Sequence, residues 1–405
     1  MMRRIKNFGH FLMALSACFV YGYPARKMMV LAITGTDGKT STAFILFHIL
    51  KKAKLPVSMI STVKAVIGNE NYDTGFHVTT PSPFFLQKLI KKALKEGSRY
   101  LVLETTSHAL DQFRTLGTSI DAAVITNISH EHLDYHGNME NYRNAKARIM
   151  QGAKTVVLNK DDENYSYLKK KARGGIVTFS LDKTADFTPD KVKLPDGLAQ
   201  FQKANMLAAV AAARESGVDL EAAENGLKSF NGIPGRMEEV KNRRGLKIMI
   251  DFAHKINALS QALIFARSQT KKKLIVVFGS AGLRDRLKRP IMGEVAGKIA
   301  DYAVLTAEDP RTEDVRKIIT QIAQGCLRSG MKELEKKNGQ PPSEKGKYFF
   351  RIPDRQEAIN FAIRKLAGAG DTVIICGKGH EQSMCYGKTE YPWDERQAVN
   401  KALSA

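Results

Sequence analysis

Hydrophobic residues along the chain gather in short runs, and amphipathic stretches separate these runs. Four runs in the first half have the length and composition of buried strands: 29–33, 100–103, 122–125 and 155–158. Residues 40–52, which follow the turn after the first of these runs, predict a helix. Strands that alternate with helices assemble into a mostly parallel sheet covered on both faces. The first half therefore predicts an α/β domain.

The same alternation begins again after a break at 232–236, where glycine and proline favour a hinge. The runs that predict its strands are 247–250, 274–278, 302–305 and 373–375. We therefore expect a central domain over 28–233 with a P-loop-type sheet, and a smaller Rossmann-like α/β domain over 234–405. Three further stretches predict a surface excursion, an alanine-rich helix and an exposed loop or frayed helix: 181–200, 205–216 and 332–347.

The segment 33–40 joins the first predicted strand to the helix after it and reads Ile-Thr-Gly-Thr-Asp-Gly-Lys-Thr. Glycines let backbone N–H groups turn inward on a polyphosphate, and the helix N-terminus adds positive potential. Lys39 would reach the outer phosphates, and the Thr40 hydroxyl would bind Mg²⁺. Ile33 stands in the place of the usual first glycine, so the loop is a shortened variant. By itself it predicts nucleotide binding, by Gly35, Thr36, Asp37, Gly38, Lys39 and Thr40.

The first 27 residues combine a basic start with an apolar run at 8–23. The pattern resembles a signal peptide. However, the run is short for a membrane span, and the nucleotide motif follows within a few residues. We therefore expect an uncleaved helix. It either packs on the body of the protein or lies on the inner face of the membrane with its basic end toward lipid headgroups.

Composition narrows the class of protein. The 405 residues are 43% hydrophobic and 26% charged, as in soluble proteins of two or three domains. A formal net charge of +22 suits anionic partners. No zinc spacing, arginine-rich tail or aromatic RNA-binding motif accompanies it, so we expect no specific nucleic-acid binding. The four cysteines are widely spaced, which predicts free thiols in a reducing, cytoplasmic compartment.

Polar residues follow two predicted strands at their carboxyl ends, where open α/β sheets bind ligands. Glu104 ends one strand and offers a hard oxygen ligand to Mg²⁺. The next strand leads into 126–137, where three histidines and two carboxylates fall within seven residues. The run as a whole predicts a site. For His130 and His136 taken singly, a solvated loop is an equal alternative.

Several motifs together resemble the Mur ligases of cell-wall synthesis. They are the shortened loop and the segments Glu104–His108, Ser129–Gly137, Pro234–Glu238 and Asp251–His254. Within that family, three segments resemble the MurE branch, which adds the third peptide residue to UDP-N-acetylmuramoyl-dipeptide: Gly279–Pro290, Glu308–Arg311 and Gly377–Glu381. The likeness runs from about residue 28 to the C-terminus.

The resemblance implies ATP-driven amide synthesis, in which the dipeptide's terminal carboxylate becomes an acyl phosphate that an amine attacks. It implies two Mg²⁺ ions, one held by Thr40 and Glu104 and the other in part by His132. Lys146 matches a lysine that is carbamylated in the family, where CO₂ addition makes it an anionic ligand. Taken alone, Lys146 reads as a surface lysine. The implied catalytic residues are Lys39, His132 and Lys146.

The resemblance also implies binding residues. For the nucleotide it adds Asn205, Arg236, Asp251 and His254, although Asn205 would also suit a helix N-cap. For the muramoyl dipeptide it implies Thr79, Thr80, Thr106 and Arg114, with an edge loop as the alternative for the first two. For the incoming diamino acid it implies Arg284, Glu308, Asp309, Arg311, Gly377 and Glu381.

The family motif Asp-Asn-Pro-Arg accompanies meso-diaminopimelate, and here it reads Glu308-Asp309-Pro310-Arg311. Arg311 favours a substrate with a distal carboxylate, and hence meso-diaminopimelate over lysine.

The chain departs from the family at its start. Residues 1–27 are too few for the family's uridine-nucleotide-binding domain, so we expect that domain to be absent. The uridine nucleotide would then be held weakly by the central domain, or the substrate would carry another handle. Two other functions stay open. One is a folylpolyglutamate-synthase-like or cyanophycin-type ligase, which 377–381 fits less well. The other is a basic ATP-binding module that acts on nucleic acid or membrane without ligation.

Overall fold

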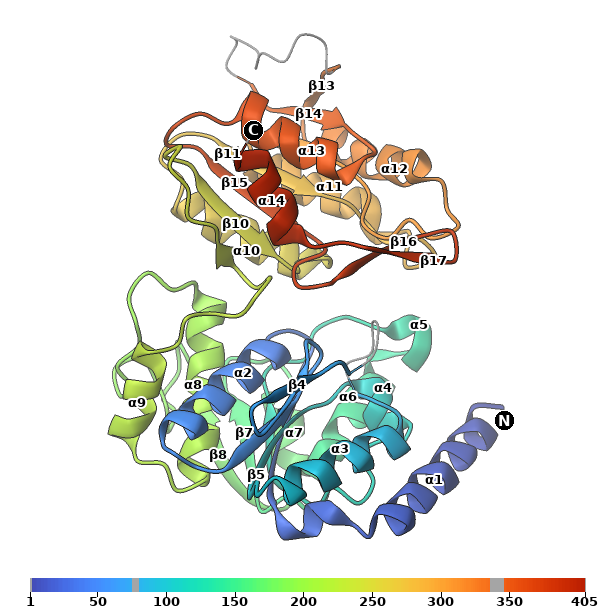
Figure 1. Cartoon of the computed structure of the whole chain (residues 1–405), viewed down its shortest axis with the longest axis vertical. Coiled ribbons are helices and arrows are strands. Elements are labelled where there is room, and N and C mark those ends of the chain that lie inside the picture. The colour runs from blue at the N-terminus through green and yellow to red at the C-terminus, as the bar shows by residue number, and fades with distance from the viewer. Residues whose placement is uncertain (1, 75–79, 336–345, 405) are drawn as a thin grey trace. The chain divides into compact units, whose positions relative to one another are not determined.

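Two sheets organise the chain, one in residues 1–231 and one in residues 232–405, and each belongs to its own unit (Figure 1). The computed structural model describes residues 2–74, 80–335 and 346–404. Thr79, predicted to bind the dipeptide, lies outside the described residues.

The first sheet has eight strands in the order β4-β3-β2-β5-β1-β6-β7-β8. The bounds are β1 Met29–Thr34, β2 Val57–Ile60, β3 Ala65–Ile67, β4 Glu70–Tyr72, β5 Tyr100–Glu104, β6 Ile120–Ile125, β7 Thr155–Asn159 and β8 Gly175–Phe179. All neighbours are parallel except at β2–β3 and β3–β4. In this register Ile33 of β1 lies opposite Glu104 of β5, and Thr34 lies opposite Ile125 of β6. The carboxyl ends of three central strands therefore meet at one edge.

Helices cover both faces of this sheet, because alternate residues of each strand are apolar on either side. One face carries α2 (Lys39–Lys52), α8 (Gln200–Glu215) and α9 (Leu220–Lys228). The other carries α3 (Pro83–Lys95), α4 (Ser107–Asp111), α6 (Met139–Ala147) and α7 (Tyr165–Lys171). Helix α1 (Met2–Tyr21) lies against α3, and the short α5 (Leu133–His136) precedes α6.

The second sheet has seven strands in the order β13-β14-β12-β11-β15-β10-β9, of which only β9 is antiparallel to its neighbour among the described residues. The bounds are β9 Glu238–Glu239, β10 Lys247–Asp251, β11 Leu274–Phe278, β12 Tyr302–Leu305, β13 Lys332–Glu333, β14 Tyr348–Arg351 and β15 Thr372–Cys376. One face packs against α10 (Ile256–Ser268), α11 (Lys288–Ile299) and α12 (Val315–Arg328). The other packs against α13 (Arg355–Phe361), a π-helical turn (Ala362–Leu366) and α14 (Glu395–Ser404). The hairpin β16 (Ser383–Tyr386) and β17 (Thr389–Pro392) stands apart from this sheet.

The predicted α/β fold with two mostly parallel sheets is confirmed, and each predicted strand is present. Helix α8 begins at Gln200, earlier than predicted, because the Ala199 N–H donates to Gln202 Oε1 and caps it there. Asn205 therefore lies inside α8, and the N-cap alternative for it is wrong. Lys332–Glu333 is an edge strand paired with β14 and not part of a loop.

Candidate active site

Two glycines shape the loop between β1 and α2. Gly38 has φ +79°, which other residues adopt only with strain. A Cβ atom there would lie 2.1 Å from Asn205 Oδ1, and a Cβ atom on Gly35 would lie 1.8 Å from Thr126 Oγ1. The Thr126 hydroxyl also donates to the Asp37 carbonyl at 2.6 Å. The loop is thus packed between the end of β6 and helix α8, with Asn205 directly against it.

Two lysines converge on the Gly35 carbonyl. Lys39, the first residue of α2, donates from Nζ to the carbonyls of Gly35 (3.1 Å) and Thr36 (2.9 Å). Lys146 of α6 donates from Nζ to the same Gly35 carbonyl at 2.5 Å. Lys146 is almost completely buried, and its Nζ lies 4.7 Å from the centroid of the Tyr142 ring. The surface alternative for Lys146 is therefore wrong, and two positive charges lie beside the loop.

Glu104 is a fully buried carboxylate at the end of β5. Its Oε1 accepts hydrogen bonds from the hydroxyls of Thr40 (2.9 Å) and Thr62 (2.8 Å), and Oε2 accepts one from the Thr62 N–H (2.9 Å). All three donors are neutral, so none of them compensates the carboxylate's charge. A hydroxyl and a carboxylate side by side form the oxygen donor set that suits Mg²⁺. Among the described residues, no group of three or more His, Cys, Asp or Glu could hold a metal ion by itself.

The histidines of 126–137 have different surroundings. His132, in the left-handed region at φ +54°, precedes α5, and its ring centroid lies 4.8 Å from that of His108 and 6.3 Å from that of Tyr142. His136 is buried with Nε2 at 3.0 Å from Ser107 Oγ, so the solvated-loop alternative is wrong for it. His130 is exposed, as that alternative expects. His132 therefore lies in one aromatic cluster with Tyr142, whose ring also neighbours the Lys146 ammonium.

Three residues predicted to bind the dipeptide lie together beside the end of β5. The Thr80 hydroxyl accepts a hydrogen bond from the Thr106 N–H (3.3 Å), and Arg114 donates to the Thr80 carbonyl (2.8 Å). The Thr106 hydroxyl caps α4 by accepting from the Ala109 N–H. Thr80 is buried, so it does not lie at an exposed edge.

Asp251, at the end of β10 in the second unit, is one of the residues predicted to bind the nucleotide. Its carboxylate accepts two backbone N–H groups at 2.7 and 2.8 Å. Burial raises the pKa of Asp251, and the charge of Arg236 opposes this rise. The Arg236 guanidinium lies 4.4 Å from the centroid of the Phe252 ring. Burial lowers the pKa of His254 well below its ordinary value, so its imidazole is neutral.

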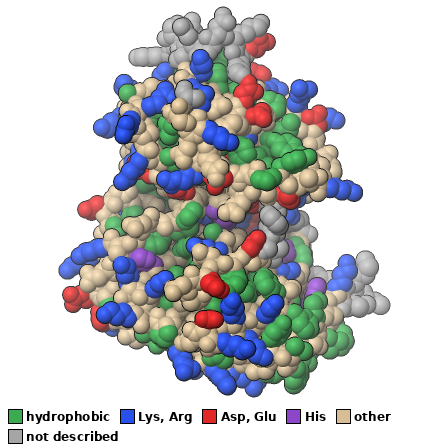
Figure 2. Space-filling model, in the orientation of Figure 1, with side chains coloured by type: hydrophobic (Ala, Val, Ile, Leu, Met, Phe, Trp, Pro, Cys, Tyr) green, Lys and Arg blue, Asp and Glu red, His purple; other side chains and the backbone are tan. Residues whose placement is uncertain are grey.

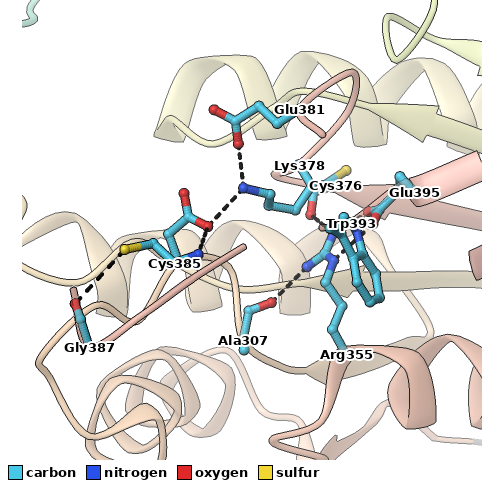
Figure 3. Close-up of polar contacts among 10 residues, drawn as sticks. Ala307, Arg355, Cys376, Lys378, Glu381, Cys385, Gly387, Trp393 and Glu395 are labelled. Atoms are coloured by element: carbon cyan, nitrogen blue, oxygen red, sulfur yellow. Dashed lines mark hydrogen bonds and ion pairs between the residues drawn. The ribbon is translucent and has the colours of Figure 1, made fainter. Parts of the chain in front are cut away.

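A charged cluster lies near the ends of β12 and β15 (Figure 3). Lys378 is fully buried, and its Nζ contacts the carboxylates of Asp309 (2.8 Å) and Glu381 (2.6 Å). Burial lowers the pKa of Lys378, but the Glu381 and Asp309 charges outweigh this and raise it. One cation between two carboxylates leaves a net negative charge, which suits a ligand ammonium.

Glu308 is buried next to this cluster. A Cβ atom on Gly377 would lie 3.0 Å from its Oε2, and this oxygen has no hydrogen-bond partner among the described residues. Burial raises the pKa of Glu308 to about 7, against the opposing charges of nearby cations. Arg311 is half-buried, with φ +54°, and its N–H donates to the Cys385 carbonyl at 2.9 Å. Arg284 lies exposed on the loop before α11.

Comparison with known proteins gives the family. Residues 33–213 match the Mur ligase middle domain, and residues 235–379 match the Mur ligase glutamate ligase domain. A UDP-N-acetylmuramoyl-L-alanyl-D-glutamate--2,6-diaminopimelate ligase from Geobacillus thermodenitrificans is 33% identical over 419 residues, covering 96% of this chain and 82% of that protein. The chain belongs to the Mur ligase family.

Two further relatives support the same family. A protein of the same name from Synechocystis sp. is 36% identical over 417 residues, covering 96% of this chain and 78% of that protein. A solved structure of a UDP-N-acetylmuramoyl-L-alanyl-D-glutamate--2,6-diaminopimelate ligase is 31% identical, with a TM-score of 0.62 over 93% of this chain and 78% of that one.

The structure adds three candidate site residues to the predicted ones: Tyr142, Lys378 and Arg355. The Tyr142 hydroxyl lies 3.0 Å from Thr36 Oγ1, and Tyr142 stands four positions before Lys146, a spacing that places both on one helix face. Lys378 lies within 377–381, one of the segments that resemble the family, and this position is the sequence signal that could have identified it. Arg355 donates to the carbonyls of Ala307 and Cys376, both at 2.9 Å, and pairs with Glu395 (Figure 3). Nothing in the local sequence marks Arg355, because its partners come from three distant segments.

Proposed function

We propose that this chain is an ATP-dependent ligase that adds the third amino acid, meso-diaminopimelate, to a muramoyl-dipeptide precursor of peptidoglycan. The observation that carries the proposal is the convergence of Lys39 and Lys146 on the Gly35 carbonyl, beside the Thr40–Glu104 pair. The names of the Geobacillus thermodenitrificans and Synechocystis relatives, which specify a diaminopimelate ligase, support the same substrates.

The chemistry requires a carboxylate to attack a polyphosphate, and the two anions repel each other. Lys39 would neutralise charge on the transferred phosphate, as the ammonium of a P-loop lysine does. The loop N–H groups would hold the other phosphates at the N-terminus of α2. The resulting acyl phosphate of the dipeptide would then be attacked by the amine of the incoming amino acid.

Mg²⁺ bound here would supply further charge neutralisation. Thr40 and Glu104 would hold one ion, since their oxygens already lie together. His132 and Lys146 would hold a second. For Lys146 this requires carbamylation, because an ammonium repels a cation while a carbamate offers two anionic oxygens. Asn205, Arg236, Asp251 and His254 would contact the nucleotide.

The second unit would bind the incoming diamino acid. The net negative cluster of Asp309, Lys378 and Glu381 would receive an ammonium group, and Arg311 would pair with a carboxylate. Because Gly377 has no side chain, the Glu308 carboxylate fits closely beside it. Arg284 would contact the bound diamino acid from its exposed loop. A distal carboxylate on Arg311 distinguishes meso-diaminopimelate from lysine.

We also propose a cytoplasmic location with contact to the inner membrane face through residues 1–27. The four cysteines are free and buried, which suits a reducing compartment.

One assay tests the reaction. Phosphate release from ATP is measured with UDP-N-acetylmuramoyl-L-Ala-D-Glu and meso-diaminopimelate, each alone and both together. We expect release only when both are present. Release that needs neither would favour the basic ATP-binding module. Release with a folate or with another acceptor, but not with the dipeptide, would favour a different ligase of the superfamily.

A further inference from the structure

Helix α1 presents an apolar face outward. The outer face of α1 carries Phe8, Leu12, Met13, Phe19 and Val20 at helical spacing, with the exposed Gly9 and Ser16 among them. Phe8, Phe19 and Val20 are 62%, 67% and 64% exposed. Five of the thirteen exposed large hydrophobic side chains in the described part of the chain lie on this one helix. Figure 2 shows hydrophobic side chains gathered in the region where Figure 1 places α1.

The opposite face of α1 is anchored to the first unit. Ala14, Ala17 and Cys18 are buried, and the Cys18 thiol donates to the Leu116 carbonyl at 3.1 Å. Nearer the start of α1, the ring of Phe11 packs edge to face against that of Phe113, with centroids 5.5 Å apart. The outer face therefore belongs to a helix that is already docked, and its exposure does not come from a detached terminus.

Positive charge surrounds the outer face. Lys6, Arg26 and Lys27 are exposed at the two ends of the segment, and the neighbouring α3 exposes Lys88 and Lys95. The first acidic residue of the chain is Asp37. Two tyrosines near the end of α1 carry cations over their rings, with Lys91 Nζ 5.8 Å from the Tyr21 centroid and the Arg26 guanidinium 4.1 Å from the Tyr23 centroid. Apolar side chains with basic and tyrosine neighbours match the layered polarity of a membrane interface.

We propose that α1 lies in the plane of an anionic lipid surface, with its outer face among the acyl chains and the basic residues at the headgroups. Among the described residues, no helix has the length and apolar content that a membrane span requires, so the contact is peripheral. The basic side chains around the outer face outnumber the nearby acidic ones, Glu70 and Glu96, and so favour anionic lipid over a second copy of this equally basic chain. This inference deepens the proposed location of the enzyme and does not depend on its ligase activity.

Vesicle flotation tests the inference without nucleotide or substrate. The full chain is mixed with vesicles of phosphatidylcholine, with or without phosphatidylglycerol. We expect it to float with the anionic vesicles and to remain largely at the bottom with the neutral ones. The double variant Phe8→Gln/Phe19→Gln should lose roughly a hundredfold in partitioning, since each buried Phe contributes about tenfold. The variant Leu327→Gln, which removes an exposed leucine of α12, should float like the wild type.

Three results would overturn the inference: no flotation of the wild type with anionic vesicles, equal flotation of the double variant, or a concentration-dependent dimer in light scattering that the double variant abolishes while vesicles do not bind. Circular dichroism checks that the double variant is folded, which we expect because both side chains are largely exposed. Phosphate release measured without vesicles should be unchanged in the double variant. A failed ligase assay and failed lipid binding are thus separate outcomes.

Discussion

The Lys146 ammonium donates a hydrogen bond to the Gly35 carbonyl, and so ties helix α6 to the loop between β1 and α2 across 111 residues of sequence. Lys39 donates to the same carbonyl. The Tyr142 hydroxyl, on the same helix as Lys146, contacts Thr36 Oγ1. The loop thus has cationic and aromatic neighbours before any nucleotide binds, and a modification of Lys146 would change its charge directly.

Lys146→Ala should lower ligation by roughly a hundredfold or more, because a buried group beside the phosphate loop is lost. If Lys146 is carbamylated, removal of CO₂ should lower the wild-type rate, and bicarbonate should restore it. Incubation with ¹³C-bicarbonate should give a carbamate signal in the carbon NMR spectrum of the wild type. Lys169→Ala, an exposed lysine on α7, is the control and should keep both the rate and the signal. A wild-type rate independent of CO₂, with no such signal, would contradict carbamylation.

Lys39→Ala should abolish ligation, because it removes the ammonium at the start of α2 that would neutralise the transferred phosphate. The measurement is phosphate release with both substrates present. Lys52→Ala, at the exposed end of the same helix, should leave the rate unchanged. Full activity in Lys39→Ala would refute the role of the loop.

Gly38→Ala should destabilise the first unit, by about 1 kcal/mol from backbone strain alone. A further loss should come from the Asn205 amide, which lies 2.1 Å from the new Cβ atom. Urea unfolding measures the sum. Gly217→Ala is the matched control, since Gly217 has φ +85° and open space around it, and so reports the strain alone. Adding Asn205→Ala to Gly38→Ala should recover the second part only. Equal losses in Gly38→Ala and Gly217→Ala would show that the close approach costs nothing.

Sequence alone predicts the loop residues well, because a strand, a glycine turn and a helix are local signals. It also places Glu104 correctly, since parallel strands bring their carboxyl ends to one edge. The short strands β3 and β4 carry too few residues for a periodic signal, and they join the sheet only because β3 pairs with β2 and β4 with β3.

Burial and pairing are harder to predict than position. Lys146 reads as a surface residue because the groups that bury it come from α6's neighbours and from a distant loop. The ion pair of the buried Lys378 with Asp309 is also hard to predict, because the two residues stand 69 positions apart. Arg284 matches a family motif but lies exposed, so a motif match alone does not fix a side chain's contacts.

Arg311→Ala should lower kcat/KM for meso-diaminopimelate by about tenfold to a hundredfold, the loss expected for one charge-assisted hydrogen-bonded pair. The rate with L-lysine, which has no distal carboxylate, should fall much less. Competition between the two amino acids for the wild-type enzyme gives the selectivity directly. Arg328→Ala, an exposed arginine of α12, should change neither rate. A wild-type preference for lysine would overturn the argument from Arg311.

Glu308 should make the second unit less stable as pH rises. Burial raises its pKa from 4.5 to about 7 in the folded chain. Between these values the folded state binds more protons than the unfolded state, so stability falls with increasing pH and levels off above about pH 7. The loss amounts to roughly 3 kcal/mol, since each pKa unit corresponds to about 1.4 kcal/mol. Glu308→Gln should therefore be more stable than the wild type at pH 8, and the difference should close near pH 4.5.

The single tryptophan makes this measurable in one unit. Trp393 belongs to residues 232–405, so its fluorescence during urea unfolding follows the second unit alone. Glu239→Gln, an exposed carboxylate of β9, is the control, and its pH profile should match that of the wild type. If wild type and Glu308→Gln keep a constant difference from pH 5 to pH 8, Glu308 does not titrate in this window. Its carboxylate would then be charged in the folded chain, and the negative charge offered to the incoming ammonium would be larger by one.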